Sequence, residues 1–334
     1  QDRMHIVDYV EQAREQKQPI QAVSDIMGMR EFEDIPLQES PGRTRAFMKI
    51  QDGCDNYCSY CIIPYARGHL RSRPLTSIAA ETRFLAEAGY REIVLTGINL
   101  GTYGREAGPY TLVDAVRTVL DEPRIARVRL SSTESLEISA DLIGLMEQDS
   151  RMCPHLHLPL QAGDDPILAA MKRPYATADY AALLECLRSR VPDLAVTTDI
   201  IVGFPGESAD SFARTVEFAS AMQFAKIHVF PYSKRSGTPA ATFAGQVSDT
   251  EKKRRVTELM RVSEQSSLAF RHRMLGKTLP VLLERVADGL AEGLTPNYQR
   301  VFVAADIAGL AENELVQVEL IQIQDEGFAG RLKK

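Results

Sequence analysis

The sequence predicts an α/β fold in which a partial (β/α)6 barrel is followed by a small antiparallel β-barrel. From Arg45 to Tyr232, six short apolar runs alternate with amphipathic stretches, which is the pattern of parallel strands joined by crossover helices. After Met274, short strand-like runs are separated by glycine and asparagine turns, as in antiparallel barrels. Six units are two short of a closed eight-unit barrel, so we expect an open barrel with its ligands at the carboxyl ends of the strands.

These elements divide the chain into four parts. Residues 1–44 are mostly polar, with one helical stretch around Ile6–Gln16, and the segment LQESPGRT indicates a linker. We expect the partial barrel over residues 45–248, a charged connecting helix over 249–273 and the small barrel, of roughly OB-like size, over 274–334. The expected strands of the partial barrel are AFMKI, EIVLTG, RVRLSS, HLHLPL, AVTTDIIVGF and KIHVFPY. The expected crossover helices are SIAAETRFLAEAG, TLVDAVRTVL, SADLIGLMEQ, YAALLECLRSRV and SFARTVEFASAM.

Composition places the chain among globular proteins of a reducing compartment. Of 334 residues, 44% are hydrophobic and 25% are charged, and no apolar run reaches the roughly 18 residues that a membrane span needs. The polar N-terminus has no signal-peptide core, so we expect a cytoplasmic protein. The net charge of −6 argues against a non-specific nucleic-acid coat. Five cysteines in a chain of this length do not make a disulfide framework and favour thiols used as ligands.

Three of the five cysteines, Cys54, Cys58 and Cys61, lie within eight residues. Three thiolates can bind three irons of a [4Fe–4S] cluster and leave the fourth iron open to a substrate. Zinc is the alternative metal for these cysteines. However, their spacing departs from paired C-x2-C zinc sites, and His69 is the only nearby candidate for a fourth protein ligand. The two remaining cysteines, Cys153 and Cys186, are expected to be small buried hydrophobic residues.

The stretch GCDNYCSYCIIPYARGHLRSR, placed after a first barrel strand, resembles the radical S-adenosylmethionine (SAM) superfamily. The resemblance implies that the open iron of a [4Fe–4S] cluster binds the amino and carboxylate groups of SAM. It also implies that an electron from the cluster cleaves SAM to methionine and a 5′-deoxyadenosyl radical. An electron donor such as a flavodoxin or ferredoxin would then be a partner.

Four longer motifs, EIVLTGINLGTYG, HLHLPLQAGDDPILAAMKRPY, TTDIIVGFPGE and HVFPYSKRSGTPA, resemble the methylthiotransferase family within that superfamily. The resemblance implies a transferase that inserts a methylthio group at C2 of an adenosine next to the tRNA anticodon, with a TRAM-type RNA-binding module at the C-terminus. The segment IIPYARG together with HVFPYSKRSGTPA is most similar to the subfamily that acts on threonylcarbamoyl-adenosine.

Three alternatives to that activity remain open. Two come from relatives that act on isopentenyl-adenosine in tRNA or on an aspartate of a ribosomal protein. The third belongs to another class and is a zinc-stabilised RNA-binding module without catalysis.

The chain departs from the family in one respect. Family members carry an N-terminal domain with three more cysteines, which hold a second [4Fe–4S] cluster that delivers sulfur, whereas no cysteine precedes Cys54 in this sequence. We therefore expect residues 1–44 to be the tail of that domain and the second cluster to lie on a domain absent from this chain. The missing initiator methionine favours the interpretation that the chain is a fragment.

Residues near the first three strand ends are candidates for binding SAM. Gly97 and Asn99 end the second strand, where a glycine permits close approach of a ligand to the backbone, although a simple βα turn explains them equally well. Ser132 and Glu134 end the third strand; Glu134 could hydrogen-bond the SAM amino group or ribose, and an N-cap role is the alternative. By resemblance, the backbone of Tyr60 lies near the SAM adenine, with a packing role as the alternative.

Three more candidates belong to the following two strands. Gln161 ends the fourth strand, and Arg173 on the next helix could bind the SAM carboxylate through a bidentate fork. A solvated surface charge is the alternative for Arg173. Asp199 lies in the apolar run AVTTDIIVGF, where a carboxylate is costly unless it is paired. That cost favours a ligand role for Asp199, such as contact with a ribose hydroxyl.

RNA contacts are expected at two places. Arg67, Arg71 and Arg73 follow the cysteines closely and could contact tRNA phosphates, with a solvated loop as the alternative. The segment from residue 274 to the end is slightly acidic, so RNA binding there would depend on shape, stacking and a few local contacts, for which Tyr298 and Arg300 are the candidates.

Overall fold

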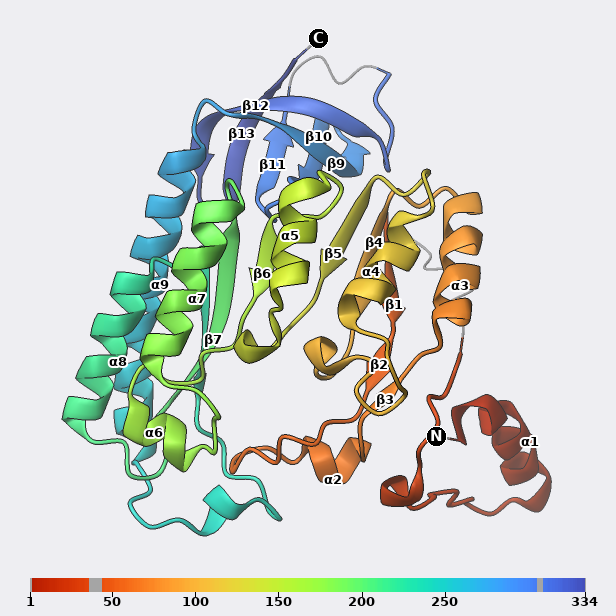
Figure 1. The fold of residues 1–334 in the computed structure, drawn as a ribbon, viewed down its shortest axis with the longest axis vertical. Coiled ribbons are helices and arrows are strands. Elements are labelled where there is room, and N and C mark those ends of the chain that lie inside the picture. The colour runs from red at the N-terminus through yellow and green to blue at the C-terminus, as the bar shows by residue number, and fades with distance from the viewer. Residues whose placement is uncertain (1, 36–43, 305–308, 334) are drawn as a thin grey trace.

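The computed structural model describes residues 2–35, 44–304 and 309–333. Six parallel strands form a curved sheet in the order of the chain (Figure 1), which confirms the predicted α/β partial barrel. These strands are β1 (Arg45–Lys49), β4 (Glu92–Thr96), β5 (Arg127–Leu130), β6 (His155–His157), β7 (Ala195–Val202) and β8 (Lys226–Pro231).

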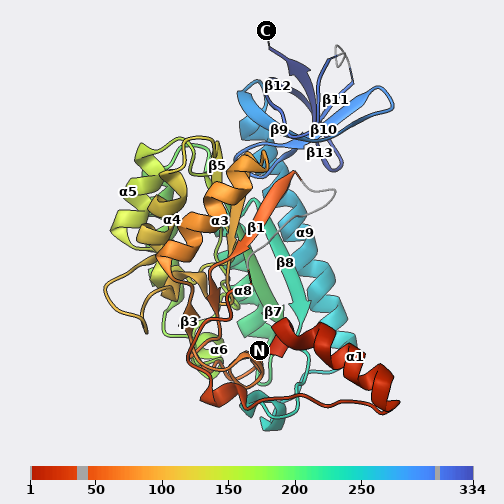
Figure 2. The same cartoon turned by 90° about the vertical axis from the view of Figure 1, so that its right-hand side faces the viewer.

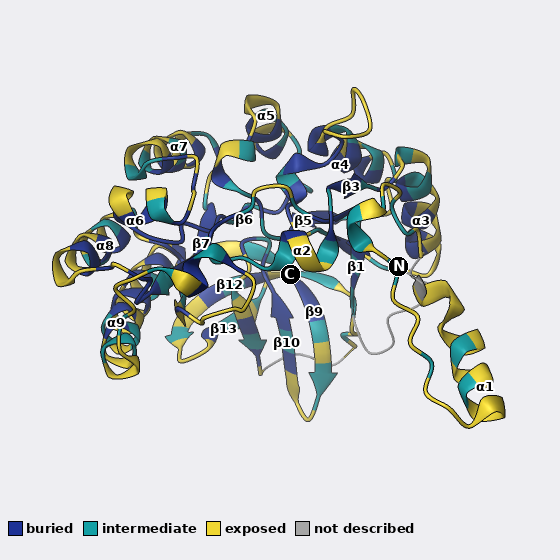
Figure 3. Ribbon diagram, turned by 90° about the horizontal axis from the view of Figure 1, so that it is seen from below, coloured by how far each residue is buried: buried dark blue, intermediate teal, exposed yellow. Residues whose placement is uncertain are grey.

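Helices cover the convex side of this sheet and leave its concave side open (Figure 3). They are α3 (Leu75–Glu87), α4 (Leu112–Leu120), α5 (Ala140–Gln148), α6 (Asp165–Ala170), α7 (Thr177–Arg190) and α8 (Ala209–Met222). In α4 the apolar residues Leu112, Val116 and Val119 recur at helical spacing and are buried. The Thr111 N–H donates to the Asp114 carboxylate (2.8 Å) at the start of this helix, which satisfies one of the free backbone donors.

The curved sheet has its weakest strand pairing between β5 and β6. The strands β1, β4 and β5 form one three-stranded sheet and β6, β7 and β8 another, and the two are joined through isolated bridges from Val128 to Met152 and from Ser132 to His157. Pro154 lies just before β6 and has no N–H to donate, so the ladder is interrupted at that point.

Strand β7 shows how the sheet separates its two faces. Val196, Ile200 and Val202 are buried in the main core, whereas Thr197 and Asp199 alternate with them and are only partly buried. Because successive side chains of a strand point to opposite faces, Thr197 and Asp199 lie on the concave side, whereas Thr198 is buried with Val196 and Ile200. Polar residues in the neighbouring strands at matching positions share that side.

Short elements surround the carboxyl ends of these strands. They are β2 (Gln51–Asp52), α2 (Ile63–Arg67), β3 (Arg71–Ser72), η3 (Leu100–Thr102), η4 (Ser135–Glu137) and η5 (Pro239–Thr242). Before the barrel lie η1 (Asp2–His5), α1 (Ile6–Gln16) and η2 (Ile26–Gly28). The predicted N-terminal helix is confirmed by α1, which buries no residue and lies at the end of the molecule away from the small barrel (Figure 2). The linker predicted at 37–44 lies, except for Thr44, outside the described residues.

A long helix, α9 (Asp249–Met274), runs beside β8 to the small barrel (Figure 2). The five barrel strands close in the order β10-β11-β13-β12-β9. The prediction of a fully antiparallel barrel is wrong at one pair, because β11 and β13 are parallel. A closed ring with an odd number of strands cannot alternate in direction throughout, so one parallel pair is unavoidable. The strands are β9 (Thr278–Ala287), β10 (Leu290–Leu294), β11 (Arg300–Val303), β12 (Leu315–Gln324) and β13 (Gly327–Leu332).

The small barrel packs against the amino ends of the parallel strands. Arg127, at the start of β5, donates to the carbonyl of Leu294 (2.9 Å), and Arg129 donates to the carbonyl of Pro296 (2.8 Å). The Tyr298 ring stacks on His155 with 4.9 Å between ring centroids. The small barrel therefore lies at the opposite end of the sheet from the carboxyl strand ends (Figure 1). Among the helices of the described ranges, none has both the length and the apolar content for a membrane span.

Candidate functional site

The cysteine loop begins at the carboxyl end of the first barrel strand. Gly53 has φ of +74°, and a Cβ at this position would lie 1.9 Å from the His69 carbonyl oxygen. Only glycine fits there, because the left-handed conformation and the close approach both exclude a side chain. The tight turn lets the Cys54 N–H donate to the Gly68 carbonyl (3.1 Å). This backbone hydrogen bond therefore fixes the position of Cys54.

The middle of the loop is anchored to the end of α6. The Ser59 N–H donates to the Met171 carbonyl (3.1 Å), and the Ser59 hydroxyl donates to the Ala170 carbonyl (2.8 Å). The Cys61 N–H in turn donates to the Cys58 carbonyl (3.0 Å). The positions of all three cysteines are therefore fixed by hydrogen bonds of the protein itself.

The separation of the thiols suits a cluster better than a single ion. In tetrahedral zinc sites a Zn–S bond of about 2.3 Å places the sulfurs about 3.8 Å apart. The three sulfurs of Cys54, Cys58 and Cys61 do not all lie within 4.8 Å of one another. The predicted fourth zinc ligand, His69, pairs with Asp55 at 2.7 Å through Nδ1, a contact that leaves Nε2 available and does not by itself exclude a metal. The separation of the thiols is the observation that favours three separate irons of a cluster.

Burial disfavours the thiolate form of Cys54 and of Cys61. Desolvation, with a contribution from neighbouring thiols, raises the pKa of Cys54 and that of Cys61. Metal binding requires the thiolate form, so the site takes up metal with release of protons. Burial also raises the pKa of Tyr60, which packs against the main core. The packing role considered for this tyrosine is therefore present in the structure.

An ion pair between a buried arginine and a partly buried glutamate lies beside Cys58. Arg173 is 7% exposed and donates to the Cys58 sulfur (3.3 Å). It also donates to both carboxylate oxygens of Glu134, one of them at 3.1 Å. Glu134 occupies the N-cap position of η4, but its side chain makes no capping hydrogen bond. Arg173 is thus no solvated surface charge, and the Glu134 side chain faces the cysteine loop.

Several buried oxygens near the same strand ends lack a hydrogen-bond partner within the protein. They lie after β4 and β5, which end close to the cysteine loop. Buried polar atoms normally find a partner, so these oxygens fit a polar ligand that supplies one. They are Asn99 Oδ1, Ser131 Oγ, Thr133 Oγ1 and Ser135 Oγ.

Gly97 has a structural reason to be a glycine. A Cβ at this position would lie 2.8 Å from Gln51 Oε1, the oxygen that accepts the Asn99 N–H (2.8 Å). The close approach predicted for Gly97 is thus made by a protein side chain, and contact with a ligand at this glycine stays a prediction.

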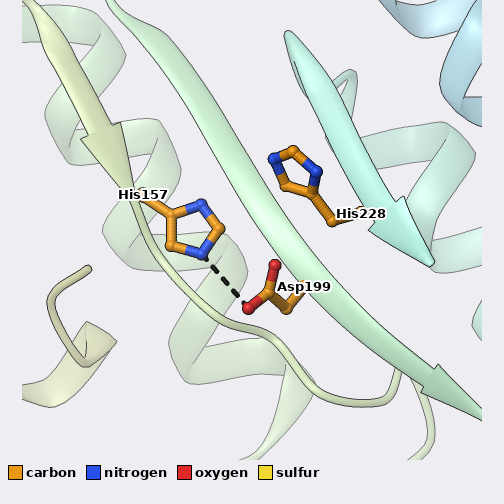
Figure 4. Close-up of side chains that lie close together, drawn as sticks. All are labelled: His157, Asp199 and His228. Carbon is orange, nitrogen blue, oxygen red and sulfur yellow. Dashed lines mark ion pairs between the residues drawn. The ribbon is translucent and has the colours of Figure 1, made fainter. Parts of the chain in front are cut away.

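The last candidates lie on the neighbouring strands. The Gln161 N–H donates to the Asp199 carbonyl (2.8 Å), and the Gln161 carbonyl accepts from the Ile201 N–H (2.9 Å). Ser132 meets β6 through the backbone bridge to His157. The Asp199 carboxylate lies 3.3 Å from His157 Nε2 (Figure 4). The structure thus brings Glu134, Arg173 and Cys58 together directly, whereas Asp199 contacts a histidine that the sequence reasoning did not select.

Two of the three arginines predicted to contact RNA are buried. Arg71 and Arg73 are 1% and 3% exposed. Arg71 donates to the carbonyls of His69 and Arg67, and Arg73 pairs with Asp34 (2.6 Å) and with Glu81. The prediction of phosphate contacts is therefore wrong for both, because these buried guanidinium groups are already occupied by hydrogen-bond and ion-pair partners within the protein. Arg67 makes a bidentate pair with Asp52 but keeps 40% of its side chain exposed.

Tyr298 and Arg300, the two residues of the small barrel predicted to contact RNA, differ in their contacts within the protein. Tyr298 is 41% exposed, but its ring stacks on His155, and the Arg129 guanidinium lies 4.6 Å from its centroid. It therefore fixes the small barrel to the sheet. Arg300 lies at the start of β11, pairs with Glu292 and keeps 44% of its side chain exposed. RNA contact stays a prediction for the exposed parts of both residues.

The two isolated cysteines were expected to be alike and are not. Cys153 is buried as predicted, and desolvation raises its pKa to about 11. Cys186 is exposed, which corrects the prediction. Helix α7 buries Tyr180, Leu184 and Leu187, and Cys186 is turned about 100° from Leu187, toward solvent.

His157 and His228 are the side chains that the sequence reasoning missed. They occupy β6 and β8, on either side of Asp199 in β7 (Figure 4). A signal was present, because alternate residues of parallel strands share one face, and HLH and KIH each place a histidine on the face that Asp199 shares.

Comparison with a family model identifies residues 48–219 as matching the radical SAM superfamily. A threonylcarbamoyladenosine tRNA methylthiotransferase, MtaB, of Bacillus subtilis is 39% identical over 90% of this chain and 68% of its own length. The protein of the same name from Thermotoga maritima is 36% identical over 98% of this chain and 74% of its own length. A tRNA-2-methylthio-N(6)-dimethylallyladenosine synthase of Acetivibrio thermocellus is 36% identical over 90% of this chain and 63% of its own length.

Solved structures of lower identity share the fold. Coproporphyrinogen III oxidase (HemN) of Escherichia coli, a radical SAM enzyme, matches with a TM-score of 0.52 at 13% identity, over 78% of this chain and 67% of that one. The radical SAM methyltransferase TsrM of Kitasatospora setae matches with a TM-score of 0.50 at 18% identity, over 59% of this chain and 38% of that one. At these identities the likeness concerns the partial-barrel fold alone.

Proposed function

Because the chain belongs to the radical SAM superfamily and, within it, to the tRNA methylthiotransferases, we propose that it inserts a methylthio group at C2 of threonylcarbamoyl-adenosine next to the tRNA anticodon. The observation that carries the proposal is the position of the three thiols beside the Glu134–Arg173 pair, at the carboxyl strand ends. The choice of nucleoside is supported by the relatives named for threonylcarbamoyladenosine and by the segments IIPYARG and HVFPYSKRSGTPA.

Cys54, Cys58 and Cys61 would hold the [4Fe–4S] cluster. When bound, that cluster supplies the electron that cleaves SAM and so starts the radical reaction. The protein itself binds and orients SAM and the substrate, and it excludes water from the site. The loop hydrogen bonds of Cys54 and Ser59 fix the thiols before any metal arrives, which lowers the conformational cost of loading the site.

The Glu134–Arg173 pair suits the amino acid end of SAM. The carboxylate of SAM can accept a bidentate fork from Arg173, and the amino group of SAM can donate to Glu134. Arg173 then exchanges one carboxylate partner for another, so its buried charge is not left alone. Asp199 and Gln161 are proposed to face the ribose. The remaining proposed contacts are Tyr60, Gly97, Asn99 and Ser132.

The partners follow from the same proposal. We propose that the small barrel is a TRAM-like RNA-binding module and that Arg67, Tyr298 and Arg300 contribute to tRNA binding through their exposed parts. A flavodoxin or ferredoxin would deliver the electron. Sulfur would come from a second [4Fe–4S] cluster, whose ligands are not among the three cysteines of the loop.

Mass spectrometry of digested RNA tests the proposal. The chain, loaded with iron and sulfide without oxygen, is incubated with SAM, a reductant and a soluble sulfide source. Three substrates are compared: tRNA with threonylcarbamoyl-adenosine, tRNA with isopentenyl-adenosine, and small ribosomal subunits. We expect a methylthio product on the first alone, and none with the Cys58→Ala variant. A product on either of the other two alone would overturn the choice of substrate.

A further inference from the structure

Three potential metal ligands converge on the concave side of the sheet, away from the cysteines in sequence. His157 on β6, Asp199 on β7 and His228 on β8 each offer one ligand atom, and these atoms all lie within 4.8 Å of one another (Figure 4). His157 Nε2 and Asp199 Oδ2 are 3.3 Å apart. All three residues are partly buried.

The convergence follows from the strand register. Asp199 lies directly opposite His228 in the β7–β8 pair, and His157 lies opposite Thr197, two residues before Asp199. Residues two apart on a strand share a face, so all three side chains leave the sheet on the same side. They are positioned by three adjacent strands and not by a loop, which gives a ligand site its precision.

Thr197 orients the first histidine. Its hydroxyl lies 2.9 Å from His157 Nδ1, which leaves Nε2 directed toward Asp199. In metal sites the second nitrogen of a histidine ligand is typically hydrogen-bonded in this way, which fixes the ring and its tautomer. Thr197 is thus placed as the outer partner that a metal-binding histidine requires.

We propose that His157, Asp199 and His228 bind one divalent transition-metal ion. Two imidazoles and one carboxylate are a donor set that zinc, iron, cobalt and nickel ions accept. Bonds of about 2.0–2.2 Å require ligand atoms about 3–3.5 Å apart. The His157–Asp199 separation of 3.3 Å already meets this requirement, and the ligand atom of His228 lies within 4.8 Å of both. Three protein ligands leave further coordination positions for water or a ligand.

The site has a consequence for the cofactor, which depends on the proposed function. Asp199 is the residue proposed to face the SAM ribose, so an ion held by this carboxylate competes with SAM for it. Divalent ions that prefer nitrogen and oxygen ligands are therefore expected to weaken SAM binding without displacing the cluster from its thiols. Metal binding itself needs neither SAM nor RNA and can be measured separately.

Cobalt titration tests the site. In a Cys54→Ala/Cys58→Ala/Cys61→Ala variant, Co²⁺ alone is added, and its visible d–d absorption is followed. We expect one bound ion without thiolate charge-transfer absorption and an affinity at least tenfold lower after His157→Ala or His228→Ala. His69→Ala, which removes a partly exposed histidine near the cysteine loop, serves as the matched control and is expected to leave the affinity unchanged. Circular dichroism verifies that each variant is folded.

A second measurement covers the case in which the triple variant does not fold. Cluster-loaded wild-type protein with one added equivalent of Co²⁺ is examined by X-ray absorption at the cobalt edge. We expect only nitrogen and oxygen neighbours around cobalt, with imidazole scattering that is lost in His157→Ala. Absence of Co²⁺ binding, sulfur neighbours, or an affinity unaffected by both histidine substitutions would overturn the proposal, and a failure of tRNA methylthiolation would leave it intact.

Discussion

Arg173 donates to both carboxylate oxygens of Glu134, and the same guanidinium donates to the Cys58 sulfur at 3.3 Å. A positive group, a negative group and a cysteine that binds metal are thereby assembled at the carboxyl ends of the strands. An amino acid bound to an open iron through its amino and carboxylate groups suits this arrangement, because its carboxylate can accept from Arg173 and its amino N–H groups can donate to Glu134. The pair is the electrostatic centre of the proposed cofactor site.

Arg173→Lys is expected to weaken SAM binding to the cluster-loaded protein at least tenfold. A lysine keeps the charge but loses the bidentate fork, and a hydrogen bond to a charged group contributes about 1.5–3 kcal/mol. Equilibrium dialysis with labelled SAM measures the effect. Arg190→Lys, which changes an arginine paired with Glu147 on the surface, is the control. Equal affinities of the wild type and Arg173→Lys would remove Arg173 from the site.

Tyr298→Ala is expected to lower the free energy of unfolding by about 2 kcal/mol. The substitution removes the stack on His155 and the cation–π contact with Arg129, each of which contributes about 0.5–1.5 kcal/mol or somewhat more. Urea unfolding measures the change. Tyr298→Phe keeps the ring and should lose much less. A loss of tRNA binding in Tyr298→Ala with no change in stability would instead favour a direct RNA contact.

Arg73→Gln is expected to destabilise the fold by about 3–5 kcal/mol, because it removes the cationic member of a buried ion pair with Glu81. The salt dependence of tRNA binding should stay the same, since Arg73 is enclosed by protein. Arg67→Gln, which changes a half-exposed arginine, is the comparison for the salt slope. An unchanged stability combined with a reduced salt slope for Arg73→Gln would restore the RNA role that the structure argues against.

His155 is expected to make the fold sensitive to mild acid. Desolvation, followed by the charge of Arg129, lowers the pKa of His155 well below its ordinary value of 6.5. The unfolded chain therefore binds a proton that the folded chain does not, so the stability gained from the neutral imidazole is present above pH 6.5 and is lost as the pH falls below it.

The pH effect is measured by comparing wild type and His155→Gln in urea at several pH values from 7.5 to 5. The wild type should lose up to about 1.4 kcal/mol per pH unit more than His155→Gln over this range. His5→Gln changes an exposed histidine and should follow the wild type. Parallel pH profiles of wild type and His155→Gln would show that the buried imidazole does not control the acid sensitivity.

The partial barrel was predictable because its strands and helices carry strong local patterns. The apolar runs that begin at Arg45 and Glu92 and the helical spacing around Val116 each depend on neighbours in the sequence. The cysteine loop was predictable for the same reason, since its spacing is local. Local sequence patterns do not indicate which distant residues a side chain contacts in the folded protein.

The errors of the sequence reasoning follow from that limit. Arg73 has an ordinary basic context in sequence, and only the fold reveals that Asp34 and Glu81 enclose it. Tyr298 has the properties of an RNA-stacking residue, yet its neighbour in space is His155, far earlier in the chain. The parallel pair of β11 and β13 follows from the closure of an odd-numbered ring, which no single strand reveals.

Electron paramagnetic resonance of the reduced, cluster-loaded chain tests the central claim most directly. The claim is that Cys54, Cys58 and Cys61 hold a [4Fe–4S] cluster with an iron open to SAM. The account predicts a [4Fe–4S]⁺ signal that shifts when SAM is added and that is lost in Cys58→Ala but retained in Cys186→Ala. A protein without a cluster signal and with one tightly bound zinc that is lost in Cys58→Ala would contradict it.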